Sequence, residues 1–253
     1  MDSETATAAL EQGATRPMGL GARLINIFIN PTAVFESIRI KPAWATVVLI
    51  LSLLSLGVTY VVVHRIGADN IITQQMKNNP MLADKSDAEL QEMASKGAKF
   101  TVGSMFVFAL LASWIVVPLI AGLIYLVAVM FGGTVRYKNY LSLTAHTFWM
   151  YSLATSTVLV LVVFLTSDPS SIDMQNAVQA NLGVLLSKQQ NPVMYSLASS
   201  LDLFTFWHLA ILGLGISVLN GRGWGYVKSL MIPLSLWVIY VGIKAAFVLA
   251  FAK

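Results

Sequence analysis

The sequence predicts an all-α polytopic membrane protein: a bundle of five transmembrane helices with short interfacial helices beside it. The 253-residue chain is 57% hydrophobic and only 11% charged, against about 25% charged residues in an average soluble domain. Five stretches of 18 residues or more are apolar on all sides, which is long enough to cross a hydrocarbon layer. Because backbone groups in lipid must be paired internally, five such stretches favour helices over barrel strands.

The segment before the first span divides into two parts. Residues 1–22 are expected to form a flexible cytoplasmic tail, and residues 23–42 an amphipathic segment leading into the membrane. Asn30 is a good N-cap and Pro31 a good first helical residue, so a short helix is expected over 31–40. This helix would either lie on the inner membrane surface or pack against the bundle.

The membrane domain is expected over residues 43–253. Its spans are predicted at about 43–63, 103–131, 141–166, 203–220 and 229–252. The second span is longer than a bilayer requires and contains Pro118, so a kink, a tilt and an extension beyond the membrane are the alternatives.

Two helices are expected in the long loops between spans. Ser86 and Glu89 form a capping-box pattern that predicts a helix start, and the helix would end near Lys96 and Gly97 or continue into the second span. Residues 173–187 place apolar side chains at helical spacing and predict a helix that rests on the outer surface or caps the bundle.

Basic residues in the short loops predict the orientation. The loops 132–140 and 221–228 carry Arg and Lys but no acid, which places them, with the amino terminus, in the cytoplasm and the carboxyl terminus outside. This inner surface is the expected site of contact with membrane lipids or with protein partners, whereas nucleic acid is not expected to bind. The candidate contact residues are Arg23, Arg39, Lys41, Arg136, Lys138, Arg222 and Lys228.

No residue pattern in the sequence predicts catalysis or a cofactor. Cysteine is absent, the three histidines lie far apart in the chain, and no acid lies inside a span, so neither a metal site nor a catalytic residue is expected. His146 and His208 lie within spans and are expected to make structural hydrogen bonds, with a role as proton relay or ligand as the alternative.

Lys244 is the one permanent charge inside a predicted span. It lies about 12 Å from the outer end, where an ammonium group is costly to bury. Three interpretations stay open: extension of the side chain to the outer interface, an ion pair with Asp202, and contact with a substrate or ion.

The third span carries seven Ser and Thr side chains between 142 and 157, which form a polar stripe. They are Ser142, Thr144, Thr147, Ser152, Thr155, Ser156 and Thr157. Small residues also recur in span five, at Gly242, Ala246 and Ala250. Both patterns are typical of helix packing within one chain, and a seam between two copies in a homo-oligomer is the alternative.

Two motifs resemble those of Yip1-domain membrane proteins. The first covers Arg23–Trp44, with Phe28, Asn30-Pro31 and Lys41-Pro42, and the second covers Asp202–Trp207 followed by Leu212, Gly213 and Gly215. The long loops resemble a bacterial branch of the family with enlarged outer loops. The chain departs from the family pattern because it has no proline in the middle of span three.

The resemblance implies five spans with a cytoplasmic amino terminus, in a bacterial cytoplasmic membrane. Eukaryotic relatives act in vesicle traffic and bind Rab-type small GTPases, a function that a shared fold alone does not transfer. The leading hypothesis is therefore a non-enzymatic Yip1-type scaffold acting through lipid or protein contacts. The alternative is a small transporter or channel that uses the polar stripe and Lys244.

Overall fold

The computed structural model describes residues 17–77, 79, 82, 84–169, 172, 177, 178, 180–187 and 190–251. These residues form α2 (Leu20–Ile29), α3 (Pro31–Ile40), α4 (Ala45–Ile66), α5 (Ala68–Lys77), α6 (Asp87–Met130), α7 (Tyr137–Leu165), η3 (Leu182–Leu185), α8 (Pro192–Ala198), α9 (Leu203–Asn220) and α10 (Tyr226–Phe251). Helices α4, α6, α7, α9 and α10 are long and apolar enough to cross a membrane. The predicted all-α bundle with five spans is confirmed.

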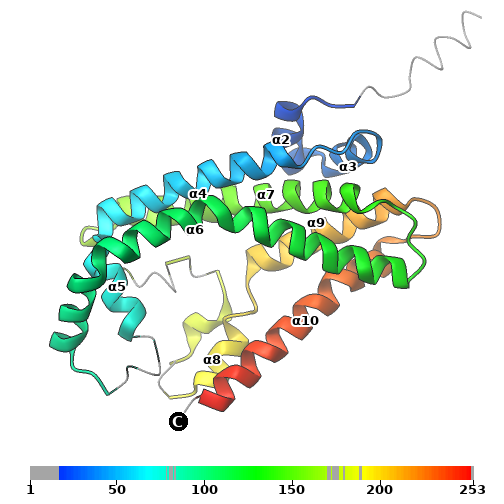
Figure 1. Ribbon diagram of the computed structural model, residues 1–253. Coiled ribbons are helices and arrows are strands. Elements are labelled where there is room, and N and C mark those ends of the chain that lie inside the picture. Colours follow the sequence, from blue (N-terminus) through cyan, green and yellow to red (C-terminus); the bar gives the residue numbers. More distant parts are fainter. Residues whose placement is uncertain are drawn as a thin grey trace, which may run out of the picture.

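The five long helices form two groups that meet at one end of the molecule. Figure 1 shows α4, α6 and α7 running alongside one another, with α2 and α3 at one end of the group and α5 at the other. Helix α9 ends and α10 begins at the end where α3 lies, and both extend from there toward the lower left, where α8 lies against α10. Gly213 of α9 allows the close approach of this pair, because a Cβ atom there would lie 2.8 Å from the Leu230 Cα.

Helix α6 starts as predicted but continues much further. The Ser86 hydroxyl accepts a hydrogen bond from the Glu89 amide and the Glu89 carboxylate accepts one from the Ser86 amide, which completes the capping box. The helix does not end near Gly97 and runs for 44 residues, about 66 Å, which is about twice the thickness of the hydrocarbon layer. The helix therefore starts well before the predicted span at 103–131, and α5 packs against this additional part.

The loop between α7 and α9 differs from the prediction. Residues 173–176 and 179 lie outside the described residues. Residues 180–187 contain only the short η3 helix, so the predicted helix over 173–187 is wrong for residues 180–187. Asn181 instead pairs with Asp202 in an isolated β-bridge, which ties the loop to the start of α9. The Asn191 side chain accepts from the Met194 amide and caps α8, a helix that the sequence did not predict.

Helices α2 and α3 form a hairpin packed on the bundle. The cap at Asn30 and the helix 31–40 are confirmed, and α2 begins at Leu20, inside the range expected to be a flexible tail. Val34, Phe35 and Ile38 are completely buried, so α3 packs against other helices and does not lie flat on a membrane surface.

The α2–α3 hairpin reaches far along the bundle. The Trp149 indole donates a hydrogen bond to the Leu24 carbonyl, and the Phe28 ring lies 6.2 Å from the Trp207 ring. Trp149 is 12 residues from the start of α7 and Trp207 is 13 residues from the end of α9, distances of about 18–20 Å along these helices. The hairpin therefore extends about 18–20 Å along α7 and α9 from the end of the bundle where it begins.

Candidate functional site

Six basic side chains are exposed at the end of the bundle where the α2–α3 hairpin enters. They are Arg39, Lys41, Arg136, Lys138, Arg222 and Lys228, and this end is called the basic end below. They come from three segments far apart in the sequence: the end of α3 with the α3–α4 link, the α6–α7 connection with the start of α7, and the α9–α10 connection with the start of α10. The prediction that these segments share one end of the bundle is confirmed.

Contacts between backbone and side chains hold the three segments together. The Asn139 amide donates to the carbonyls of Ile38 and Arg39 at 3.0 and 3.2 Å, which joins α7 to α3. The Lys228 ammonium donates to the Phe131 carbonyl at 3.3 Å and lies 4.2 Å from the centre of the Trp224 ring. The basic end is thus built from fixed loops and not from independent tails.

The α9–α10 connection is a tight turn that contains three glycines, at positions 221, 223 and 225. Gly221 and Gly223 have φ angles of 71° and 88°, which other residues rarely adopt. The Ser217 hydroxyl donates to the Trp224 carbonyl at 2.6 Å and closes the turn. This geometry leaves Arg222 exposed at the tip of the turn.

Arg23 does not belong to this surface. Its side chain is 2% exposed, and its guanidinium donates to the carbonyls of Met18, Ser37 and Lys41 at 3.0, 3.4 and 2.8 Å. Burial lowers the pKa of the Arg23 guanidinium from its usual value. Arg23 therefore ties the two ends of the α2–α3 hairpin together, and its expected role in surface contact is corrected to a structural one.

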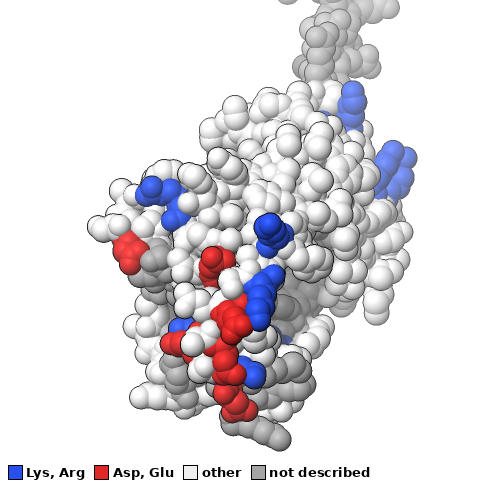
Figure 2. Space-filling model, turned by 60° about the vertical axis from the view of Figure 1, so that its left-hand side comes forward, with Lys and Arg blue, Asp and Glu red and all other residues white. Residues whose placement is uncertain are grey.

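The opposite end of the bundle carries charges of both signs. Figure 2 shows acidic and basic side chains side by side over α5 and the start of α6. The ion pairs found within the described residues all lie here: Lys77–Asp87 at 2.9 Å, Lys85–Glu89 at 3.4 Å and Lys96–Glu92 at 2.6 Å. The two ends therefore differ in charge balance, since the far end carries acids and three of them, Asp87, Glu89 and Glu92, are paired with lysines.

The two histidines inside spans are separate and buried. His146 Nδ1 lies 2.7 Å from the Ser142 carbonyl oxygen and donates to it, as a structural histidine would. The His208 ring lies 5.0 Å from Phe148 and 5.2 Å from Tyr151. Within the described residues, the Nε2 atoms of both rings are buried without a hydrogen-bond partner, and no cluster of metal ligands is present.

Lys244 and Asp202 do not form an ion pair. The Lys244 ammonium donates to the Ser196 carbonyl and to the hydroxyls of Ser199 and Ser200 at 3.1–3.2 Å. Asp202 instead caps α9 by accepting from the Thr205 amide at 2.8 Å. Of the three interpretations, the structure overturns the ion pair: the ammonium reaches the carboxyl end of α8 instead, where a helix dipole stabilises a cation.

The polar stripe of α7 divides into two parts with different surroundings. Ser142, Thr144 and Thr147 are completely buried near the basic end. The Ser142 hydroxyl joins α7 to the α3–α4 link, because it donates to the Ala43 carbonyl and accepts from the Ala43 amide, both at 3.1 Å. This part of the stripe packs helices within the chain, as the first of the two alternatives proposed.

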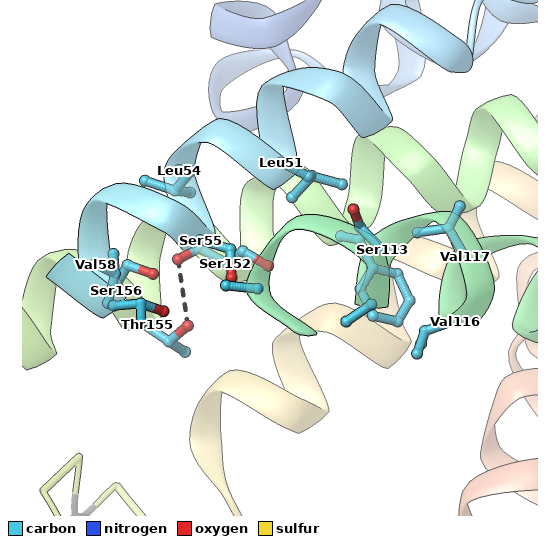
Figure 3. A pocket seen from close by; sticks show the side chains of 14 residues that line it. Leu51, Leu54, Ser55, Val58, Ser113, Val116, Val117, Ser152, Thr155 and Ser156 are labelled. Atoms are coloured by element: carbon cyan, nitrogen blue, oxygen red, sulfur yellow. Dashed lines mark hydrogen bonds between the residues drawn. The ribbon is translucent and has the colours of Figure 1, made fainter. Parts of the chain in front are cut away.

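The second part of the stripe lines a pocket of about 290 Å³ between α4, α6 and α7. Ser152, Thr155 and Ser156 of α7 contribute hydroxyls, and Figure 3 shows them facing Ser55 of α4. Thr59 of α4 and Ser113 of α6 complete the set of hydroxyls, while the remaining lining side chains are apolar. Lys244 does not line this pocket, so the structure does not bring together the two features of the transporter hypothesis.

The sequence analysis missed the three hydroxyls that α4 and α6 contribute to the pocket. Ser52, Ser55 and Thr59 recur at intervals of three and four residues on one face of α4, and that spacing was the available signal. Ser113 is a single hydroxyl in an apolar span, and nothing in the sequence links it to α4. In the structure its hydroxyl lies 2.8 Å from that of Ser52.

The sequence was compared with known protein families, curated proteins and solved structures, and it matches a family model. The family model of the Yip1 domain matches residues 25–248, nearly the whole chain, from the middle of α2 to the last turn of α10. No curated protein and no solved structure matches the sequence. On the strength of the family match, the chain belongs to the Yip1 domain family of multi-pass membrane proteins.

Proposed function

We propose that this protein is a non-enzymatic membrane scaffold whose basic end lies at the cytoplasmic face and binds anionic lipid headgroups. The observation that carries the proposal is the convergence of six exposed cations from three fixed segments. Each Lys or Arg near an anionic membrane surface contributes about 1 kcal/mol of attraction. The membership in a family of membrane proteins that is not a known enzyme family supports a role in binding.

The side chains that surround the cations of the basic end support a lipid as the bound partner. The loops are short, and exposed apolar side chains surround them: Ile40, Met130, Phe131 and Val227. Apolar side chains beside cations match the boundary between acyl chains and headgroups. A soluble protein would have to bind the same cations within the headgroup layer. The experiments below also detect such a protein.

The orientation is tested with single cysteines, because the natural chain contains none. Arg222→Cys places a thiol in the α9–α10 turn, and Ser86→Cys places one at the opposite end. In spheroplasts, a membrane-impermeant maleimide is expected to label Ser86→Cys only, and Arg222→Cys is expected to react after lysis. The reverse pattern would contradict the proposed orientation.

Lipid selectivity is tested with spin-labelled lipids in vesicles containing the full-length protein. The wild type is expected to immobilise phosphatidylglycerol in preference to phosphatidylcholine. The variant Arg136→Gln, Lys138→Gln, Arg222→Gln is expected to lose most of this preference, since about 1 kcal/mol per charge is removed. The matched control is Lys77→Gln, Lys85→Gln, Lys96→Gln at the opposite end, which should retain the preference.

Equal selectivity in the two triple variants would overturn the lipid-binding proposal. Co-purification of a soluble protein that the first variant loses and the control retains would assign the basic end to a protein partner instead. A transport function is a second candidate that the hydroxyl-lined pocket favours. Solute flux in vesicles that Ser152→Leu abolishes would establish transport and replace the scaffold proposal.

A further inference from the structure

The pocket between α4, α6 and α7 is built from hydroxyls and apolar side chains, without any charged group. Its walls carry Ser55, Thr59, Ser113, Ser152, Thr155 and Ser156. The lining residues of α4 begin six residues into that helix and those of α7 begin eleven residues into that one. These positions lie about 9–17 Å from the helix starts at the basic end, inside the hydrocarbon layer.

Four of these hydroxyls are not used by the protein. Thr155 donates to the Tyr151 carbonyl of its own helix, and Ser113 is bonded to Ser52. Within the described part of the chain, the hydroxyls of Ser55, Thr59, Ser152 and Ser156 make no hydrogen bond to another protein group. A hydroxyl without a partner in an apolar environment is unfavourable by about 1–3 kcal/mol, so these groups suit a ligand that can donate or accept hydrogen bonds.

The apolar lining limits what such a ligand can be. Leu51, Leu54, Val58, Val117 and Phe148 cover the rest of the wall. A charged group in this environment would lack a counter-ion and would be strongly disfavoured. A volume of about 290 Å³ is at the lower end of ligand pockets and accommodates a polar group with the first part of a chain, but not a whole two-chain lipid.

We propose that this pocket binds the polar group of an uncharged membrane lipid through its hydroxyl or carbonyl oxygens. The lipid chains would extend from the pocket into the surrounding bilayer. Diacylglycerols and isoprenoid quinones share this chemistry, since both combine neutral oxygen groups with long apolar chains. The proposal is independent of the basic end, which faces charged headgroups.

The test uses the full-length protein in phosphatidylcholine vesicles with a diacylglycerol that carries a photoreactive diazirine near its glycerol. After illumination, mass spectrometry is expected to find adducts within 51–59, 109–117 and 148–156. Ser152→Leu fills the pocket and is expected to reduce these adducts about tenfold, whereas Thr157→Leu, on the exposed side of the same helix, should leave them unchanged.

A pair of more conservative variants, Thr155→Val and Thr157→Val, keeps the test valid if the Ser152→Leu variant does not fold. Thr155 and Thr157 both donate to a carbonyl four residues earlier, at 2.9 and 2.7 Å, but only Thr155 lines the pocket. Thr155→Val is expected to reduce adducts about fivefold, the effect of one lost hydrogen bond of about 1 kcal/mol, and Thr157→Val is the matched control.

Competition identifies the source of the ligand. Excess dioleoylglycerol or a short-chain ubiquinone is expected to suppress labelling, and the stronger competitor assigns the pocket to a glycerolipid or to a quinone. Anionic dioleoylphosphatidylglycerol should not compete. Equal competition by the anionic lipid, adducts outside the three segments, or equal labelling of the Thr155→Val and Thr157→Val variants would overturn the proposal.

Discussion

The two halves of α7 show opposite relations between polarity and burial. Residues 139–147 are buried without interruption, although they include Asn139, Ser142 and His146. Beyond Thr147 the helix is apolar toward its end, yet of its residues only Met150 and Val163 are buried. The first half is enclosed by α3, α4 and α9 with α2 beside them, whereas the second half faces the pocket and the surroundings of the bundle. Within this membrane protein, burial follows the protein cover and not the hydropathy of the segment.

The largest effect is expected at the residue that holds this cover in place. Arg23→Met leaves the carbonyls of Met18, Ser37 and Lys41 without a donor, at about 1–3 kcal/mol for each buried group. We expect a loss of about 3 kcal/mol or more in unfolding free energy, measured by denaturant titration in detergent. Arg39→Met changes an exposed arginine and is expected to stay within about 0.5 kcal/mol of the wild type. Equal stability of the two variants would show that Arg23 does not hold the hairpin.

A smaller loss is expected where α9 and α10 touch. Gly213→Ala would place a Cβ 2.8 Å from the Leu230 Cα, so the two helices would have to separate. Overpacking of this kind costs about 1–3 kcal/mol, measurable as a lower midpoint of thermal unfolding. Gly242→Ala is the control, since nothing lies within 4 Å of its Cβ position. A midpoint unchanged by Gly213→Ala would contradict the close approach of these helices.

The contrast within α7 is tested directly by two serines of the same helix. Ser142→Ala leaves the amide and carbonyl of Ala43 without their partner, and we expect a loss of about 1–2 kcal/mol. Ser156→Ala removes a hydroxyl that faces the pocket, and its unfolding free energy should be close to that of the wild type. Denaturant titration of both variants checks this, and a reversed order would contradict the comparison.

The smallest and most local effect is expected far from the covered half. Ser86→Ala removes the cap of α6, worth about 1 kcal/mol. Because this end of α6 is exposed, faster amide hydrogen exchange should be confined to about its first two turns. Ser95→Ala, within the same exposed part of the helix, is the control and should leave the exchange of 87–90 unchanged. Faster exchange across the whole of α6 would show that the opening of its exposed first turns is coupled to the opening of the rest of the helix.

The comparison also explains what could be predicted from the sequence. The five spans and the caps at Asn30 and Ser86 depend on local composition and on neighbours three residues away, and these predictions are confirmed. The burial of Arg23 depends on carbonyls that two different helices bring together, so its charge alone predicted an exposed position. The contact of Lys244 with the end of α8 also depends on two different helices. It could not be predicted because α8 has only seven residues and no long apolar pattern.

The unbroken course of α6 has a mechanical consequence. One continuous helix joins the charged tip beside α5 to the pocket wall at 109–117, with its first turns set at an angle to the rest (Figure 1). Pro118 directly follows this wall. The helix lacks one backbone hydrogen bond at this position, because proline has no N–H to donate. Since the same helix carries the tip and the pocket wall, a displacement of the tip would pass to the wall through continuous backbone, and the helix bends most easily just beyond the wall, at Pro118.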